Sequence, residues 1–254
     1  MIKLFRKIRQ KLLSENKFSK YLLYAVGEIV LVVIGILIAL QINNWNEGKK
    51  EAESQQKLFA NLKIDFENRL SELEEFHASK RQAITNISRI NAIISSSHKE
   101  FDEDEVGALL AYQLNNFSFN EDFKLLEGVF NTGLINDIKN ETLKRKLIEW
   151  PQLVEEMLEE QRIFQNDNLT KYGPLLEKYI SNRRLYEHFD FRNYALPKGG
   201  QITLKENYEG LLKDPLLENL LATKEVHLRI SVIDLGNLTN EAKEIIRLLE
   251  LTHD

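Results

Sequence analysis

Two Glu-x-x-His pairs, Glu74 with His77 and Glu250 with His253, are the residues in this sequence best suited to metal chemistry. This spacing occurs in di-iron helical bundles, which also need two further inward-facing glutamates at the same level of the bundle. His253 is the penultimate residue, where a helix end frays. We therefore expect both pairs to lie on solvated helix faces and to bind no metal.

Other catalytic patterns are missing from the sequence. It contains no GxGxxG, GxxxxGK[ST] or GxSxG motif. It has no cysteine, which excludes disulfides, thiol nucleophiles and Cys-based zinc or iron–sulfur sites. We expect no catalytic residue and no cofactor, and we predict that the protein is not an enzyme.

One apolar run carries a row of candidate contact residues on one helix face. Residues 21–42 contain a single ionisable side chain, that of Glu28. Val32, Gly35 and Ala39 follow Glu28 at spacings of four, three and four, on the same helix face. Gly35 and Ala39 form a small-xxx-small pair, which lets two membrane helices approach closely. These four residues are a candidate helix–helix contact; the alternative is that Glu28 reaches toward the lipid head groups.

The same run is long enough to cross a membrane, because 22 helical residues span about 33 Å and a hydrocarbon core is about 30 Å thick. Residues 1–20 carry a charge of +6, whereas residues 43–254 carry −10. The positive-inside rule then places the N-terminus in the cytoplasm. We predict a basic cytoplasmic segment (1–20), a transmembrane helix (21–42) and an extracytoplasmic domain (43–254). A cleaved signal peptide and a buried core helix are the alternatives.

The basic segment has its own candidate role. Apolar residues lie on roughly one side of residues 2–13, with basic residues around the rest, which suits a short helix on an anionic inner leaflet. The alternative is an unstructured tail that only sets the orientation. The candidate leaflet contacts are Lys3, Arg6, Lys7, Arg9 and Lys11.

The rest of the sequence is typical of long helices. Only 11 glycines and 4 prolines occur in 254 residues, too few turn signals for a β-sandwich or barrel. Mostly apolar residues alternate spacings of three and four in residues 59–94, 143–179 and 217–249, the pattern of a coiled-coil seam. We predict an all-α fold in which three long helices form an up–down–up bundle, with short helices at its distal end.

Helix boundaries can also be predicted. Asp102, Asn120 and Asn140 are expected N-caps, and Gly133 is expected to end a short helix. A further helix is expected to start at Asp214-Pro215. Pro151 is expected to kink the second long helix, and Gly173-Pro174 to break it.

A long connection, residues 181–204, gathers cations and aromatic rings. In an up–down–up bundle this connection returns toward the outer membrane leaflet, where it could rest on head groups or clasp a partner. The alternative is that the aromatic rings plug the open end of the bundle. The candidate residues are Arg183, Arg184, Tyr186, Arg192 and Tyr194.

The opening segment, FRKIRQKLLSENKFSKYLLYAVGEIVLVVIGILIALQINNWNE at residues 5–47, resembles that of a large domain-of-unknown-function family of single-pass proteins from Bacteroidota. DFKLLEGVFNTGLINDIKNETLKRKLIEW at residues 122–150 resembles a second pattern of that family. There the family usually has Ser-Gly in place of Thr132-Gly133, and often a Tyr pair in place of Trp150-Pro151. The resemblance implies a bacterial inner-membrane protein with a periplasmic helical domain, and it implies no known activity.

These features favour a non-enzymatic, membrane-anchored periplasmic helical module that binds a partner or assembles into an oligomer. The expected partners are the lipid bilayer and a second copy or another membrane protein. The acidic body excludes nucleic acid as the default partner, because phosphate binding needs a basic surface. The alternative is a periplasmic ligand sensor, which would have to signal through a partner membrane protein because only about 20 residues precede the membrane segment. An enzyme with an unrecognised site is the third hypothesis.

Overall fold

The structure, a computed structural model, describes residues 18–96, 100–115, 119, 123–189 and 203–251, without the side chains of residues 18–21 and 24. The described residues contain helices and no strand, so the fold is all-α. The chain divides into two compact units, Met1–Leu58 and Phe59–Asp254. We call the second the packed unit.

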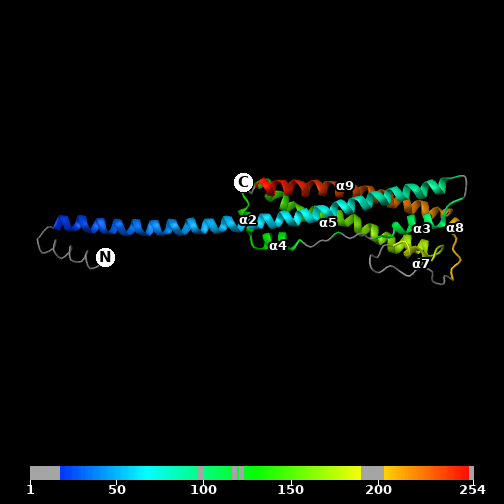
Figure 1. The fold of residues 1–254 in the computed structure, drawn as a ribbon, viewed down its shortest axis with the longest axis horizontal. Helices are drawn as coiled ribbons and strands as arrows, with labels where there is room; N and C mark the ends of the chain where they lie inside the picture. The colour runs from blue at the N-terminus through cyan, green and yellow to red at the C-terminus, as the bar shows by residue number, and fades with distance from the viewer. Residues whose placement is uncertain (1–17, 97–99, 116–118, 120–122, 190–202, 252–254) are drawn as a thin grey trace. The chain divides into compact units, whose positions relative to one another are not determined.

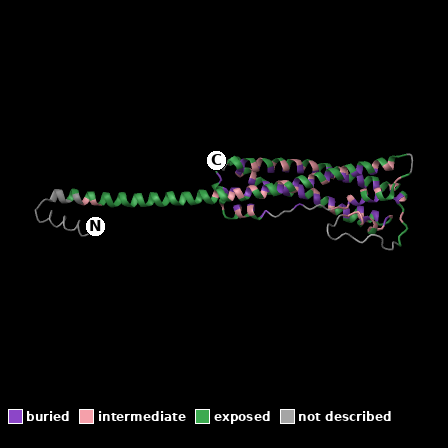
Figure 2. Cartoon of the chain, in the orientation of Figure 1, coloured by how far each residue is buried: buried purple, intermediate pink, exposed green. Residues whose placement is uncertain are grey.

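Helix α2 (Phe18–Ser95) contains residues of both units. In the first unit its apolar side chains are exposed (Figure 2). By length and composition this part of α2 could cross a membrane, and none of its most apolar stretch is buried. In the packed unit the burial of the α2 side chains becomes periodic. Ten of the eleven positions that make up the predicted seam over residues 59–94 are buried. The exception, Ile94, is half-buried.

Nine further helical elements complete the described part of the packed unit (Figure 1). They are α3 (Glu103–Tyr112), α4 (Lys124–Asn131), the 3₁₀ turn η1 (Leu134–Asp137), α5 (Glu141–Asp167), the π turn η2 (Asn168–Tyr172), α6 (Gly173–Leu176), α7 (Asn182–Tyr186), α8 (Tyr208–Leu212) and α9 (Pro215–Leu251).

Several predicted boundaries are confirmed. The Asp102 carboxylate accepts a hydrogen bond from the Asp104 amide, and the Asn140 side chain accepts from the amides of Thr142 and Leu143. Both are therefore N-caps. The Asp214 carboxylate likewise accepts from the Leu216 amide at 2.9 Å, at the start of α9.

The remaining boundary predictions have different outcomes. Gly133 has φ +77°, the left-handed conformation expected just after α4. Asn120 lies outside the described residues, and α4 begins at Lys124. Pro151 lies inside α5, and the kink expected there stays a prediction. The predicted break at Gly173-Pro174 is preceded by a π turn rather than a loop.

The predicted up–down–up order is wrong. Phe66 and Trp150 are in edge-to-face contact with ring centres 4.9 Å apart, and the Lys80 ammonium lies 4.6 Å from the Phe164 ring. The second contact lies further toward the C-terminus than the first on both α2 and α5, so these two helices are parallel.

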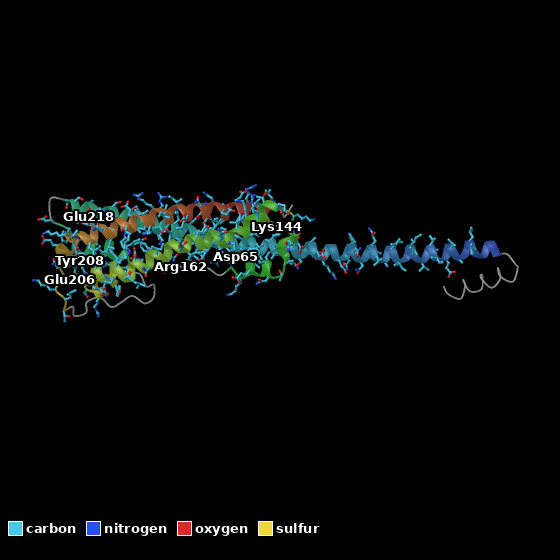
Figure 3. The ribbon with its side chains drawn as sticks, turned by 180° about the vertical axis from the view of Figure 1, so that it is seen from behind. Asp65, Lys144, Arg162, Glu206, Tyr208 and Glu218 are labelled. Carbon is cyan, nitrogen blue, oxygen red and sulfur yellow. The ribbon has the colours of Figure 1, made fainter. Side chains whose placement is uncertain are left out.

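Helix α9 is antiparallel to both. Its residue Glu250 pairs with Lys63 at 2.9 Å, and Lys243 pairs with Glu74 at 2.9 Å, so positions on α9 decrease as those on α2 increase. Figure 3 shows the same order: Asp65 and Lys144 lie toward one end of the packed unit and Glu218 at the other.

The descending segment between α2 and α5 is made by the short helices. The Tyr112 hydroxyl donates to the Ser79 carbonyl at 3.2 Å, and Arg89 pairs with Glu105 at 2.7 Å, so α3 runs antiparallel to α2. Phe123, just before α4, lies 6.2 Å from Trp150. The short helices are therefore not collected at one end. Of these, α3, α4 and η1 come between α2 and α5 and return the chain to the start of α5.

Candidate functional site

Two buried lysines are the most unusual feature of the packed unit. Lys80 of α2 and Lys224 of α9 occupy seam positions and are 4% and 3% exposed. Their ammonium nitrogens lie 4.6 and 4.1 Å from the centre of the Phe164 ring of α5, within the range of cation–π contacts. Lys80 also faces Phe76 at 4.8 Å, and Lys224 faces Tyr172 at 4.4 Å. We call Lys80, Phe164 and Lys224 the lysine centre.

A chain of amide hydrogen bonds connects the lysine centre to the backbone. The Lys224 ammonium donates to Oδ1 of Asn168. Nδ2 of Asn168 donates to the Gln113 carbonyl at 3.0 Å, and Nε2 of Gln113 donates to the Ala83 carbonyl at 3.0 Å. This chain ties α9, η2, the turn after α3, and α2 together in the interior. Buried amides that are bonded in this way fix the relative positions of the elements that carry them.

The π turn η2 places Asn168 and Tyr172 at the centre. Its carbonyl at Asn168 accepts from the Gly173 amide, five residues on. A Cβ on Gly173 would lie 2.9 Å from that carbonyl oxygen, so the turn needs glycine here. The Tyr172 hydroxyl then donates to the Leu110 carbonyl of α3 at 3.2 Å. Single π turns within helices occur often at functional sites.

Burial changes the protonation of both lysines. It lowers the pKa of Lys80 to about 8. Burial is also the main reason why the pKa of Lys224 falls to about 7; the Lys80 charge lowers it further, and the Asp167 carboxylate opposes the change. Asp167 itself pairs with Lys171 at 2.8 Å. Within the part of the chain that the structure describes, neither Lys80 nor Lys224 forms an ion pair, so their charges are offset by ring faces and one amide oxygen.

Two hollows of the packed unit lie away from these lysines. One, of about 340 Å³, is open to the surface and is lined by residues of α2 that include Glu74 and His77. The other, of about 90 Å³, lies between the end of α2 and α8, lined by Ile93, Phe101 and Leu212 among others. Neither is lined by a residue of the lysine centre. Because Lys80 and Lys224 are almost completely buried, the centre is a closed, titratable layer of the core.

A second titratable group lies between α5 and α9. Nδ1 of His227 is 2.9 Å from Oε2 of Glu160. Burial raises the pKa of the nearby Asp234, and the negative charges of Glu160 and Glu156 raise it further. Asp234 therefore lies near two other carboxylates at this edge of α9.

The two Glu-x-x-His pairs, which we expect to bind no metal, are only partly described by the structure. Glu74 pairs with Lys243, and His253 lies outside the described residues. Among the described residues no group of three or more His, Asp or Glu side chains is placed to hold a metal ion.

The predicted contact stripe lies on the exposed part of α2. Val32 and Ala39 are exposed, Glu28 is half-buried, and no atom lies within 4 Å of the position that a Cβ on Gly35 would take. Its role in a helix–helix contact stays a prediction. The basic residues predicted at the inner leaflet lie outside the described residues.

The predicted loop residues are only partly described. Arg184 pairs with Glu187 at 3.2 Å and Glu206 at 3.8 Å, and the Tyr186 ring lies 5.3 Å from that of Phe189. Arg184, Glu187, Tyr186 and Phe189 belong to α7 and its C-terminal turn, Arg183 also lies in α7, and Glu206 lies before α8.

Helix α7 packs against α3, at the end of the packed unit where α8 also lies (Figure 1). Whether this segment lies near lipid head groups or contacts a partner stays a prediction. Arg192 and Tyr194 lie outside the described residues.

Comparison with known proteins gives one match. Residues 28–106 match a family described as "Family of unknown function (DUF6090)". The match begins within the membrane-like run and ends in α3, and it supports an uncharacterised domain family. No curated protein and no solved structure matches the chain.

Proposed function

We propose that the protein is a non-enzymatic helical module, anchored in a bacterial inner membrane by one transmembrane helix, that binds a protein partner or assembles with itself. The observation that carries the proposal is the exposure of the apolar run of α2. Burying apolar surface is worth about 25 cal/mol per Å², so a long helix that exposes only such side chains needs a cover. Lipid supplies that cover.

The basic residues before the run support an orientation with the N-terminus in the cytoplasm and the packed unit, as a helical bundle, in the periplasm. A reporter that is active only outside the cytoplasm, fused after Asp254, tests this. Activity there of a reporter that works only in the cytoplasm would reverse the orientation.

A binding role accords with the interior of the packed unit, because its titratable centre is enclosed. The test is purification of the full chain from membranes in a mild detergent, followed by native mass determination and identification of co-purifying proteins. We expect a complex heavier than one chain. A single chain without any partner would contradict the proposal.

A sensor that signals through a partner membrane protein is a second candidate, favoured by the lysine centre. Two like charges share a buried layer there, and one of them has a pKa of about 7. A proton or a small anion that changed this layer could shift how α2, α5 and α9 pack. In that case the mass or composition of the purified complex should change between about pH 6 and about pH 8.5. A complex with the same mass and composition at both pH values would contradict the sensor and leave the binding module as the remaining candidate.

A further inference from the structure

Helix α9 carries a second row of seam spacing on the face opposite its buried one. The row alternates spacings of four and three over seven positions, and every member is exposed and uncharged. In a chain with 29% charged residues, a solvent-facing helix row without a charge is unusual. Its members are Asn219, Thr223, Val226, Ile230, Ile233, Asn237 and Asn240. We call them the outer row of α9.

The middle of the outer row is apolar. Val226, Ile230 and Ile233 are 57%, 38% and 63% exposed, although branched aliphatic side chains favour burial. The buried row of α9 already contacts α2 and α5, so the outer row has no partner within the described residues of the chain. Gly236 beside it has open space where a Cβ would lie, which permits close approach of another helix.

We propose that the outer row of α9 pairs in parallel and in register with the outer row of a second copy of this chain. This proposal rests on the proposed function and names the partner. In heptad terms Thr223, Ile230 and Asn237 take a positions, and the other four members take d positions. An Asn at an a position bonds to its equivalent in the partner helix and fixes the register of a coiled coil.

Charge favours the parallel arrangement. In a parallel pair, g position 229 of one helix lies beside e position 234 of the other. Arg229 of each copy, which pairs with Glu225 of its own helix at 2.6 Å, would then also face Asp234 of the other copy, near the carboxylates of Glu160 and Glu156. An antiparallel pair centred on Ile230 would instead oppose Arg229 with Arg229.

Membrane anchoring favours the same sense. A parallel pair keeps both Phe59 ends, where the chain enters the packed unit, on the same side, as two copies anchored in one membrane need. The outer row is only about 30 Å long, so the pairing is weak in dilute solution. Two copies held in one membrane meet at a high effective concentration, and the stripe from Glu28 to Ala39 would add a contact of the same sense.

The absence of native cysteine allows a direct test in native membranes. Full-length chains that carry one of Asn219→Cys, Ile230→Cys, Asn237→Cys or Asn240→Cys are oxidised and separated without reductant. We expect each variant to form a disulfide-linked dimer, because in-register residues of a parallel pair face each other. Ile148→Cys, at a 52% exposed site on α5, is the matched control and should remain monomeric.

A disruption experiment complements the cross-linking. Ile230→Glu with Ile233→Glu should lower the dimer fraction at least tenfold, as measured by native mass of the detergent-purified chain. Ile148→Glu should leave that fraction unchanged. Circular dichroism checks that the variants keep their helix content, and we expect it to be unchanged because all three sites are exposed.

The other outcomes separate this inference from the proposed function. Cross-linking at Ile230→Cys without cross-linking at Asn219→Cys or Asn240→Cys would mean antiparallel pairing and overturn the arrangement. A dimer that none of these cysteines links, or a single chain with a different co-purified protein, would overturn the outer row as a self-contact and leave the proposed function standing. A single chain with no partner would overturn both.

Discussion

Two layers of the packed unit use the same helix positions in opposite ways. Phe66 of α2 meets Trp150 of α5 edge to face, with ring centres 4.9 Å apart. Two heptads further along both helices, the equivalent positions hold Lys80 and Phe164, in cation–π contact at 4.6 Å. One layer is an aromatic layer, which Phe123 extends. The other is the lysine centre.

The layers differ in how they treat charge. Arg69, beside the aromatic layer, lies 5.9 Å from the Phe123 ring and also pairs with the part-exposed Glu72 at 2.7 Å. Its charge thus has a carboxylate partner near solvent. The ammonium groups of Lys80 and Lys224 instead face aromatic rings, and that of Lys224 also bonds to an amide oxygen. Because burying a charge without an ion partner is costly, the lysine centre lowers stability where the aromatic layer raises it. Stability alone does not account for these lysines.

Of the changes to the two layers, removing the central ring of the aromatic layer should lower the free energy of unfolding the most. Trp150 is fully buried, so Trp150→Ala loses its burial and leaves a cavity. We expect the free energy of unfolding to fall by about 3–5 kcal/mol, measured by denaturant unfolding of the detergent-solubilised chain.

Two controls accompany this substitution. Ile148→Ala, at an exposed site on the same helix, should change the free energy of unfolding by less than about 0.5 kcal/mol. Trp150→Phe should cost far less than Trp150→Ala, since Nε1 of Trp150 has no hydrogen-bond partner among the described residues. A loss below about 1 kcal/mol for Trp150→Ala would mean that this layer is not the stabilising one.

The lysine centre should make stability depend on pH in a definite direction. The pKa of Lys224 falls from 10.5 in the unfolded chain to about 7 in the folded protein, and that of Lys80 to about 8. The unfolded state therefore binds more protons between these values, and stability rises with pH. For Lys224 alone we expect a gain on the order of 2–3 kcal/mol from about pH 6.5 to about pH 9.

Neutralising this lysine should remove most of that gain. Lys224→Met fills a similar volume without a charge, so it should raise stability near neutral pH and flatten the pH dependence of unfolding. Lys146→Met is the matched control on α5, because Lys146 pairs with Glu241 at 2.8 Å near the surface. It should lower stability by at most about 1 kcal/mol. If the stability of the wild-type protein instead decreased from about pH 6.5 to about pH 9, the lysines would not be charged as inferred.

Much of the helix architecture could be predicted because seam spacing reports burial directly. Phe59, Leu73 and Ile87 on α2, and Leu217 and Leu235 on α9, are all buried where the pattern placed them. The caps Asp102 and Asn140 could be predicted as well, because a cap is a local hydrogen bond within three residues.

The order of the helices could not be predicted in the same way. Seam spacing shows that a helix has a buried face, and it is silent on which helix covers that face or in which direction. Residues 96–140 read as a distal cap of short helices, yet α3 and Phe123 return along α2. The lysine centre was also missed, although Lys80 and Lys224 stood at seam positions. A lysine there can bury its stem and extend its ammonium to solvent, so sequence alone does not reveal burial of the charge.

The π turn offers the smallest change that separates the two layers. Gly173→Ala adds one methyl group, which would lie 2.9 Å from the Asn168 carbonyl oxygen. The turn must shift to relieve this contact, and Asn168 holds the Lys224 ammonium. We expect a loss of about 1–2 kcal/mol in the free energy of unfolding and a change in the pH dependence of unfolding, with no change in the fluorescence of Trp150 in the distant aromatic layer.

Gly128→Ala is the matched control, because Gly128 lies inside α4 with open space at its Cβ position. It should stabilise the protein by about 0.5–1 kcal/mol through helix propensity. If Gly173→Ala behaved as Gly128→Ala does, the π turn would not constrain the lysine centre.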